Sequence, residues 1–331
     1  MIKNVVMRGL TRIALAPGPV GLIGRKRRGG VDRDLDPQVA AVLELQRMLK
    51  LPALDSLTPA KARRLAEEGL SPLDVPFAQM AEVIDTAAGS VPIRIFVPHD
   101  AGPHWIVYFH GGGGVIGSIR ASEPITRLLA AQTRCTVASV EYRLGPEHKH
   151  PAAIDDAVAA FTWVRARAAG KVAVAGDSFG GFLCAHVSRR AKPDLQILIY
   201  PMTDPTMSLP SVERHAEGYL LTRSMIHWFR SNYFHADDDR RAAAPLFWTD
   251  LGGAPPAIVV TAGFDPLVDE GDRHAAALSA AGVLVVHRRY PSLIHGFLSL
   301  GGGVRAARAA IDELCQDIVH GMLVTACSSG N

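Results

Sequence analysis

The sequence KVAVAGDSFG, residues 171–180, decides the fold, because an apolar β-prone run leads directly into a tight turn flanked by glycines. Gly176 and Gly180 stand two residues before and two residues after Ser178, where a sharp strand-to-helix turn leaves no room for larger side chains. The run Phe182 to Arg190 that follows is compatible with a helix. This context places Ser178 at the carboxyl edge of a sheet, where α/β folds carry their functional sites.

A second glycine-rich segment, HGGGG at residues 110–114, follows another β-prone run, Trp105 to Phe109. Peptide N–H groups that no Cβ atom shields can approach a developing negative charge closely. His110 is interpreted as a structural residue that shapes the loop. The predicted donors of an oxyanion hole are the backbone N–H groups of Gly111, Gly112, Gly113 and Phe179.

A serine hydroxyl is a weak nucleophile near neutral pH, so Ser178 needs a base that an acid holds in the right tautomer. His295 is the candidate base, because SLIHGF at residues 292–297 forms a predicted loop after the β-prone stretch from Val283 to Tyr290.

The candidate acid is Asp265, which follows the β-prone run Ala257 to Ala262 and precedes Pro266, a residue suited to begin a helix. Asp269 and Glu270 are competitors, interpreted as early-helix acids that favour a helix N-terminus. The order of serine, aspartate and histidine along this chain is the one found in α/β hydrolases.

With these segments the chain resembles the hormone-sensitive lipase family of α/β hydrolases, which includes the bacterial family IV carboxylesterases. The resemblance runs from about Trp105 to Phe297, and its main segments are YFHGGG (108–113), EYRLGPEH (141–148), GDS (176–178), LIYP (198–201), GYLLT (218–222), DPLVDEG (265–271) and IHGF (294–297). It implies a serine carboxylesterase acting on short- to medium-chain esters. Ser178 would be the nucleophile, His295 the general base and Asp265 its partner.

Two positions depart from the family pattern. Phe179 stands where the family usually has alanine, and Gly114 stands where an aromatic residue is frequent. Backbone donation survives either change. The hypothesis is that the Phe179 ring occupies space vacated near Gly114 and reshapes the ester pocket.

The resemblance leaves three rival functions open. A peptidase or amidase could use the same three side chains. Some relatives have become hormone receptors by losing the catalytic histidine, a change that the retained His295 argues against. A lipase acting at an oil interface is disfavoured, because no strong interfacial anchor is evident. A homodimer is possible by analogy with relatives.

Composition supports a globular enzyme: 331 residues, 48% hydrophobic and 20% charged, with a net charge of only +3. No basic face interleaved with aromatic residues indicates a nucleic-acid partner. Neither a cofactor nor a metal is predicted, since no acidic or histidine cluster has ligand spacing. Four scattered cysteines, without CxxC spacing, favour free thiols and a cytoplasmic location. They are Cys135, Cys184, Cys315 and Cys327.

The N-terminus is strongly basic through position 33 and is broken by Pro17 and Pro19, which argues against a signal peptide. No run approaches the roughly 18 apolar residues of a membrane span. The segment is interpreted as a cap helix over the active site, with a membrane-surface helix as the alternative. Its basic residues are Lys3, Arg8, Arg12, Arg25, Lys26, Arg27, Arg28 and Arg33, set against Asp32.

Alternating strand and helix patterns predict an α/β-hydrolase fold, with a mostly parallel central sheet flanked by helices and a helical cap. The predicted divisions are N-terminal cap helices in 1–75, a hydrolase core in 76–202 and 251–331, and an aromatic-rich cap insertion in 203–250. Helices are expected at Pro37 to Leu49 and Pro59 to Gly69, ahead of the core.

Overall fold

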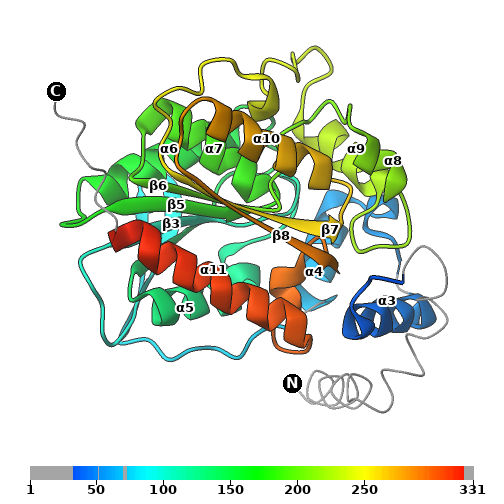
Figure 1. The fold of residues 1–331 in the computed structure, drawn as a ribbon, viewed down its shortest axis with the longest axis horizontal. Coiled ribbons are helices and arrows are strands. Elements are labelled where there is room, and N and C mark those ends of the chain that lie inside the picture. Colours follow the sequence, from blue (N-terminus) through cyan, green and yellow to red (C-terminus); the bar gives the residue numbers. More distant parts are fainter. Residues whose placement is uncertain (1–32, 51, 70–72, 324–331) are drawn as a thin grey trace.

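One twisted sheet organises this protein, and it is seen edge-on in Figure 1. The computed structural model describes residues 33–50, 52–69 and 73–323; the basic N-terminal segment predicted to form a cap helix and the predicted free thiol of Cys327 lie outside these ranges. The strands within them are β1 (Glu82–Ala88), β2 (Val91–Val97), β3 (Trp105–Phe109), β4 (Thr136–Val140), β5 (Val172–Asp177), β6 (Leu195–Ile199), β7 (Ala257–Phe264) and β8 (Val285–Ile294).

The strands lie in the order β1-β2-β4-β3-β5-β6-β7-β8. β2 runs antiparallel to β1 and β4, and every other neighbouring pair is parallel. Parallel strands covered on both faces read as continuous apolar runs. In β3 and β5 nearly every residue is buried, as the two β-prone runs predict. The predicted fold class is therefore confirmed.

Helices cover both faces of the sheet. One layer holds α6 (Ala152–Arg165), α7 (Phe179–Ala191) and α10 (Val268–Ala280), and the other holds α5 (Ile119–Thr133) and α11 (Arg305–Leu323). The helix expected over Phe182 to Arg190 is present within α7. α5 begins at Ile119 because the Ser118 side chain caps it, accepting a hydrogen bond from Ala121 N at 3.1 Å.

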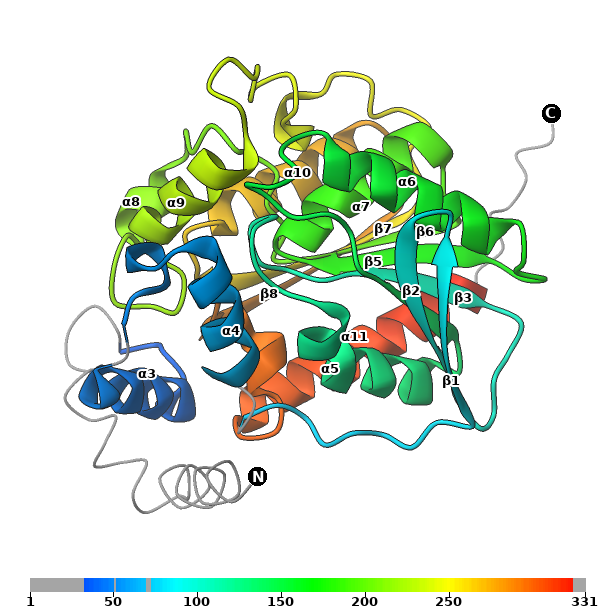
Figure 2. The same cartoon turned by 180° about the vertical axis from the view of Figure 1, so that it is seen from behind.

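The remaining helices gather beyond the carboxyl ends of the parallel strands (Figures 1 and 2). Within the described residues they are α3 (Pro37–Leu49), α4 (Pro59–Gly69), α8 (Pro210–Arg214) and α9 (Arg223–Tyr233). The short 3-10 turns of the same residues are η2 (Leu54–Ser56), η3 (Pro245–Phe247) and η4 (Phe297–Leu300). The segments predicted to form the cap thus lie near one another. Their treatment as a cap distinct from the core stays a proposal.

α4 is tied directly to the loop that follows β3. Arg63 donates from Nε to Val115 O and from Nη2 to Gly145 O, both at 2.8 Å, and also pairs with Glu147. Because hydrogen bonds from a guanidinium are stronger than neutral ones, this contact fixes α4 against the glycine-rich segment.

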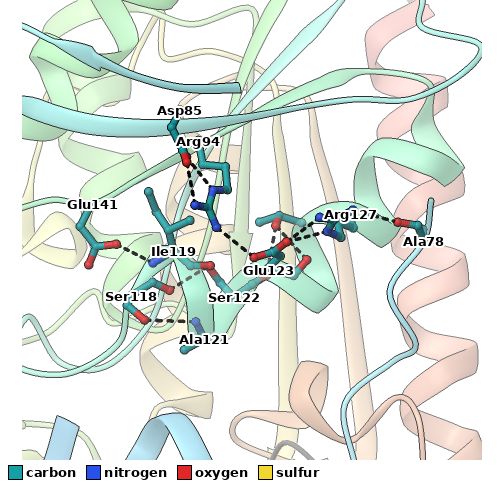
Figure 3. Close-up of polar contacts among 11 residues, drawn as sticks. Ala78, Asp85, Arg94, Ser118, Ile119, Ala121, Ser122, Glu123, Arg127 and Glu141 are labelled. Carbon is teal, nitrogen blue, oxygen red and sulfur yellow. Dashed lines mark hydrogen bonds and ion pairs between the residues drawn. The ribbon is translucent and has the colours of Figure 1, made fainter. Parts of the chain in front are cut away.

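A network of ion pairs fixes the β1–β2 hairpin to α5 (Figure 3). Arg94 on β2 binds both carboxylate oxygens of Asp85, at 2.7 and 2.9 Å, and donates to Glu123 on α5 at 3.2 Å. Glu123 also accepts from Arg127 at 2.7 Å, and Arg127 donates to Ala78 O. The Glu123 side chain is 11% exposed, whereas that of Asp85 is 69% exposed.

Glu123→Gln should lower the free energy of unfolding by about 2 kcal/mol, because it leaves Arg127 without a counter-charge in a site that water barely reaches. Asp85→Asn is the matched control and should cost under about 1 kcal/mol, since that carboxylate is mostly solvated. Urea unfolding monitored by circular dichroism measures both. Equal losses of unfolding free energy in the two variants would show that burial of the carboxylate does not determine its contribution to stability.

Candidate active site

Ser178 lies at the turn between β5 and α7 with the uncommon backbone angles φ 56° and ψ −115°. A Cβ added at Gly176 would overlap the backbone of Gly180, and one added at Gly180 would overlap Phe109 O on the neighbouring strand. Both flanking positions therefore require glycine, as the sequence predicts. A non-glycine residue at positive φ is held there by its surroundings and projects its side chain from the turn.

Ser178, His295 and Asp265 meet although they lie on three separate segments. His295 Nε2 is 3.0 Å from Ser178 Oγ, and His295 Nδ1 is 2.8 Å from Asp265 Oδ2. The second oxygen of Asp265 accepts a hydrogen bond from Leu267 N at 2.8 Å. Asp265 is fully buried and His295 is 8% exposed, so their interaction is shielded from water.

The two competing acids point elsewhere. Asp269 accepts from Ser211 N at 2.9 Å and pairs with Arg214. Glu270 is buried and accepts from Thr203 N at 2.6 Å, and burial raises its pKa well above the usual range. Neither contacts the imidazole of His295.

The glycine-rich loop presents two N–H groups that are not engaged by the protein. Gly112 and Gly113 have φ of 117° and 62°, a region that favours glycine. Among the described residues, no acceptor meets their N–H groups or that of Phe179. Gly111 differs from the expectation, because its N–H donates to Asp177 Oδ1 at 3.0 Å. It is an anchor of the loop and not a free donor.

Asp177 is a positioning residue that the sequence analysis did not single out. The same Oδ1 atom accepts from Tyr108 Oη at 2.7 Å, so this partly buried carboxyl joins β3, β5 and the start of the loop. Burial raises the pKa of Asp177, which the bonds from Tyr108 and Gly111 oppose. Its position directly before the serine was the sequence feature that could have indicated this positioning role.

His110 has the structural surroundings expected of it. Its ring stacks on Tyr142 with centroids 4.3 Å apart, and its Nδ1 lies 2.8 Å from Gly111 O. Burial lowers the pKa of His110 to about 4, so the ring is neutral at neutral pH.

The comparisons with known proteins agree on one family. A family model described as the alpha/beta hydrolase fold matches residues 106–299, more than half of the chain. The carboxylic ester hydrolase LipN of Mycobacterium tuberculosis is 37% identical over 302 residues, covering 82% of this chain and 80% of LipN. The ethyl acetate hydrolase of Pseudomonas putida is 33% identical over 301 residues, covering 82% and 95% of the two chains. The chain belongs to the hormone-sensitive lipase-like carboxylesterases.

Solved members of the family share the architecture. An ester hydrolase from the metagenome of Lake Arreo, solved with a derivative of bipyridine phosphonate, superposes with a TM-score of 0.82 at 35% identity, covering 86% of this chain and 98% of that one. A thermostable esterase from Pseudomonas putida gives a TM-score of 0.82 at 30% identity, covering 88% and 98%.

Phe179 and Gly114, the two positions at which this carboxylesterase departs from the family pattern, lie in contact. A Cβ at Gly114 would lie 2.7 Å from Phe179 Cζ, so the ring fills the space that a side chain there would occupy. Phe179 is 1% exposed and packs edge-on against Tyr233, with centroids 4.7 Å apart. The first half of the hypothesis, that the ring lies beside Gly114, thus agrees with the geometry.

Ser178 and His295 open into a cavity of about 900 Å³. Its walls come from the glycine loop, from α3 and α4, and from α9, and most of the lining side chains are apolar. Such a volume suits an organic molecule larger than an acetate ester.

Neither a metal cluster nor a membrane span is found in the described part of the chain. No group of three histidine, cysteine or acidic side chains there could hold a metal ion. Among helices in the same residues, none has the length and apolar character needed to cross a bilayer.

Gly111→Ala should reduce kcat/KM for a soluble ester by about 100-fold, because the added methyl overlaps the Asp177 carboxylate and displaces the loop that carries the free N–H groups. Gly252→Ala is the control, since nothing lies within 4 Å of its added Cβ. Initial rates with a 4-nitrophenyl ester compare the two. Wild-type turnover in Gly111→Ala would contradict the role given to the loop.

Proposed function

We propose that this protein hydrolyses short- to medium-chain carboxylic esters through an acyl-enzyme formed on Ser178. The supporting observation is the continuous relay from Asp265 through His295 to Ser178 Oγ, with contacts of 2.8 and 3.0 Å, beside unengaged backbone N–H groups. The family membership of the chain supports the same reaction class.

In the first half-reaction His295 Nε2 accepts the proton of Ser178 Oγ while the oxygen attacks the ester carbonyl. The N–H groups of Gly112, Gly113 and Phe179 stabilise the negative oxygen that forms. Asp265 stays ionised and stabilises the imidazolium. His295 then donates its proton to the departing alcohol, leaving the acyl group on the serine.

In the second half-reaction water replaces the alcohol. His295 accepts a proton from the water as it attacks the acyl carbon, the same N–H groups hold the oxyanion, and the proton returns to Ser178 Oγ as the carboxylic acid leaves. No metal or cofactor takes part in this proposal.

The rival functions are less well supported. A peptidase or amidase would use the same three side chains, but the relatives named above are ester hydrolases. A receptor without catalysis would not need His295 within 3.0 Å of the serine. Interfacial lipolysis gains no support from the described residues.

Cellular location, partners and the cap are further features that we propose for this enzyme. The thiols of Cys135, Cys184 and Cys315 are free and buried, which supports a cytoplasmic location. We likewise propose that the enzyme has no nucleic-acid partner and that it is able to form a homodimer, and that residues 1–75 and 203–250 act as a cap over the site.

Ser178→Ala should reduce kcat by roughly a million-fold, since the nucleophile acts with its base as a unit. The control is Ser188→Ala on the same helix, whose buried hydroxyl has no partner among the described residues, and whose activity should stay near wild type. A fluorophosphonate should label the wild type at the peptide containing Ser178, as mapped by mass spectrometry. Labelling elsewhere, or turnover that survives Ser178→Ala, would exclude this nucleophile.

Phe179→Ala should shift the acyl-length preference toward longer chains, because it empties space beside Gly114 while keeping the backbone donor. The measurement is relative kcat/KM for 4-nitrophenyl acetate, butanoate, hexanoate and octanoate. Phe161→Ala, a buried ring of α6 that does not line the cavity, controls for lost packing. An unchanged profile in Phe179→Ala would refute the second half of the hypothesis.

A further inference from the structure

The side of α9 that faces the cavity carries a charged residue among apolar ones. Spacings of one, three, one and three residues place side chains on a single face of a helix. Apart from Ser224 in the first turn, the α9 residues that line the cavity follow this spacing: Met225, Ile226, Phe229, Arg230 and Tyr233. Arg230 therefore belongs to the inward face.

The Arg230 guanidinium forms no ion pair with the described residues. It is half buried, and its Nε has no hydrogen-bond partner. Among the described residues no carboxylate forms an ion pair with it, and this includes the acids that also line the cavity, Asp55, Asp74, Asp177 and Glu217. Asp204 attracts it electrostatically, but the Asp204 oxygens already accept four hydrogen bonds from Thr206 and Ser208.

A second unpaired guanidinium increases the positive charge. Arg240 is close enough to repel Arg230, and its own Nε is also buried without a partner in the described chain. Burial lowers the pKa of Arg230, and the charge of Arg240 lowers this pKa further by a smaller amount. Arg230 still remains protonated at neutral pH. Two half-buried cations that form no ion pair within the described chain destabilise the fold, a cost that a bound anion would offset.

Arg230 lines the same cavity as Ser178 and His295. The ring of its neighbour Phe229 packs on the glycine loop, where a Cβ at Gly113 would lie 2.5 Å from Phe229 Cδ1. On another side, Met202 lines the same cavity and donates its N–H to Ser178 O at 3.0 Å. A long ester bound at Ser178 therefore shares this cavity with Arg230.

We infer that the substrate is an ester bearing a carboxylate, which the Arg230 guanidinium binds inside the cavity. This inference rests on the proposed ester hydrolysis at Ser178. The unoccupied Nε and a terminal nitrogen form a planar fork that matches two carboxylate oxygens. The apolar walls accommodate the carbon chain between the two ends. The carboxylate belongs either to the acyl part, as in a half-ester of a dicarboxylic acid, or to the alcohol part.

The test compares charged and neutral esters of matched shape. On the acyl side, mono-4-nitrophenyl adipate is paired with 4-nitrophenyl hexanoate; on the alcohol side, 4-carboxyphenyl butanoate is paired with phenyl butanoate. In Arg230→Met the charged-to-neutral ratio of kcat/KM should fall roughly 10- to 100-fold in one pair, as expected for a lost charge-assisted contact. The pair that responds assigns the carboxylate to its side of the ester.

Two variants serve as controls. Arg223→Met removes an arginine from the solvent side of the same helix, where it pairs with Glu213, and should leave both ratios unchanged. Arg230→Lys keeps the charge without the fork and should retain part of the preference. The urea midpoint of Arg230→Met should not fall, because that side chain has no partner to lose.

The outcomes separate the two proposals. If Arg230→Met changes neither ratio while neutral esters are still hydrolysed, the carboxylate site is wrong and ester hydrolysis stands. If the wild type hydrolyses none of the four esters, both proposals fail.

Discussion

The close approach of two neighbouring strands at Ser178 is the constraint on which the site depends. Gly180 rests against Phe109 O, so the end of β3 and the beginning of α7 are in direct backbone contact. Because β3 and β5 pair in parallel, their carboxyl ends meet at one edge of the sheet. This one contact both turns the serine outward and places the glycine loop beside it.

Two carboxyl groups, one partly and one fully buried, then fix the glycine loop and the imidazole. Asp177 holds the loop through Gly111 and Tyr108, and Asp265 holds the imidazole of His295. Each lies directly after a central strand or at its last residue, where rigid backbone positions it. Burial strengthens such interactions by excluding water, so small side chains suffice to orient the site.

The cavity wall differs from the core in the side chains that it contains. The central strands β3, β5 and β6 are mostly apolar and buried, whereas α9 combines aromatic packing with an arginine that forms no ion pair within the described residues. Its aromatic residues both fill space and bound the cavity, because Phe229 packs on the loop that holds the oxyanion donors. An unpaired cation in such a wall is consistent with a ligand that supplies the missing charge.

The sequence by itself determined the strand–turn–helix around Ser178, the order of the three polar residues, and the bounds of α3 and α4, because glycine spacing, helix-start residues and apolar periodicity are local properties. Tertiary structure decided what depends on distant partners. Asp177 and Gly111 are bonded although 66 residues separate them, and this removes Gly111 from the free donors. Phe179 fills the space at Gly114, and Arg230 lacks a counter-ion, only because of how helices pack beyond the sheet edge. Side-chain pairing across a fold is set by three-dimensional proximity, which no local pattern encodes.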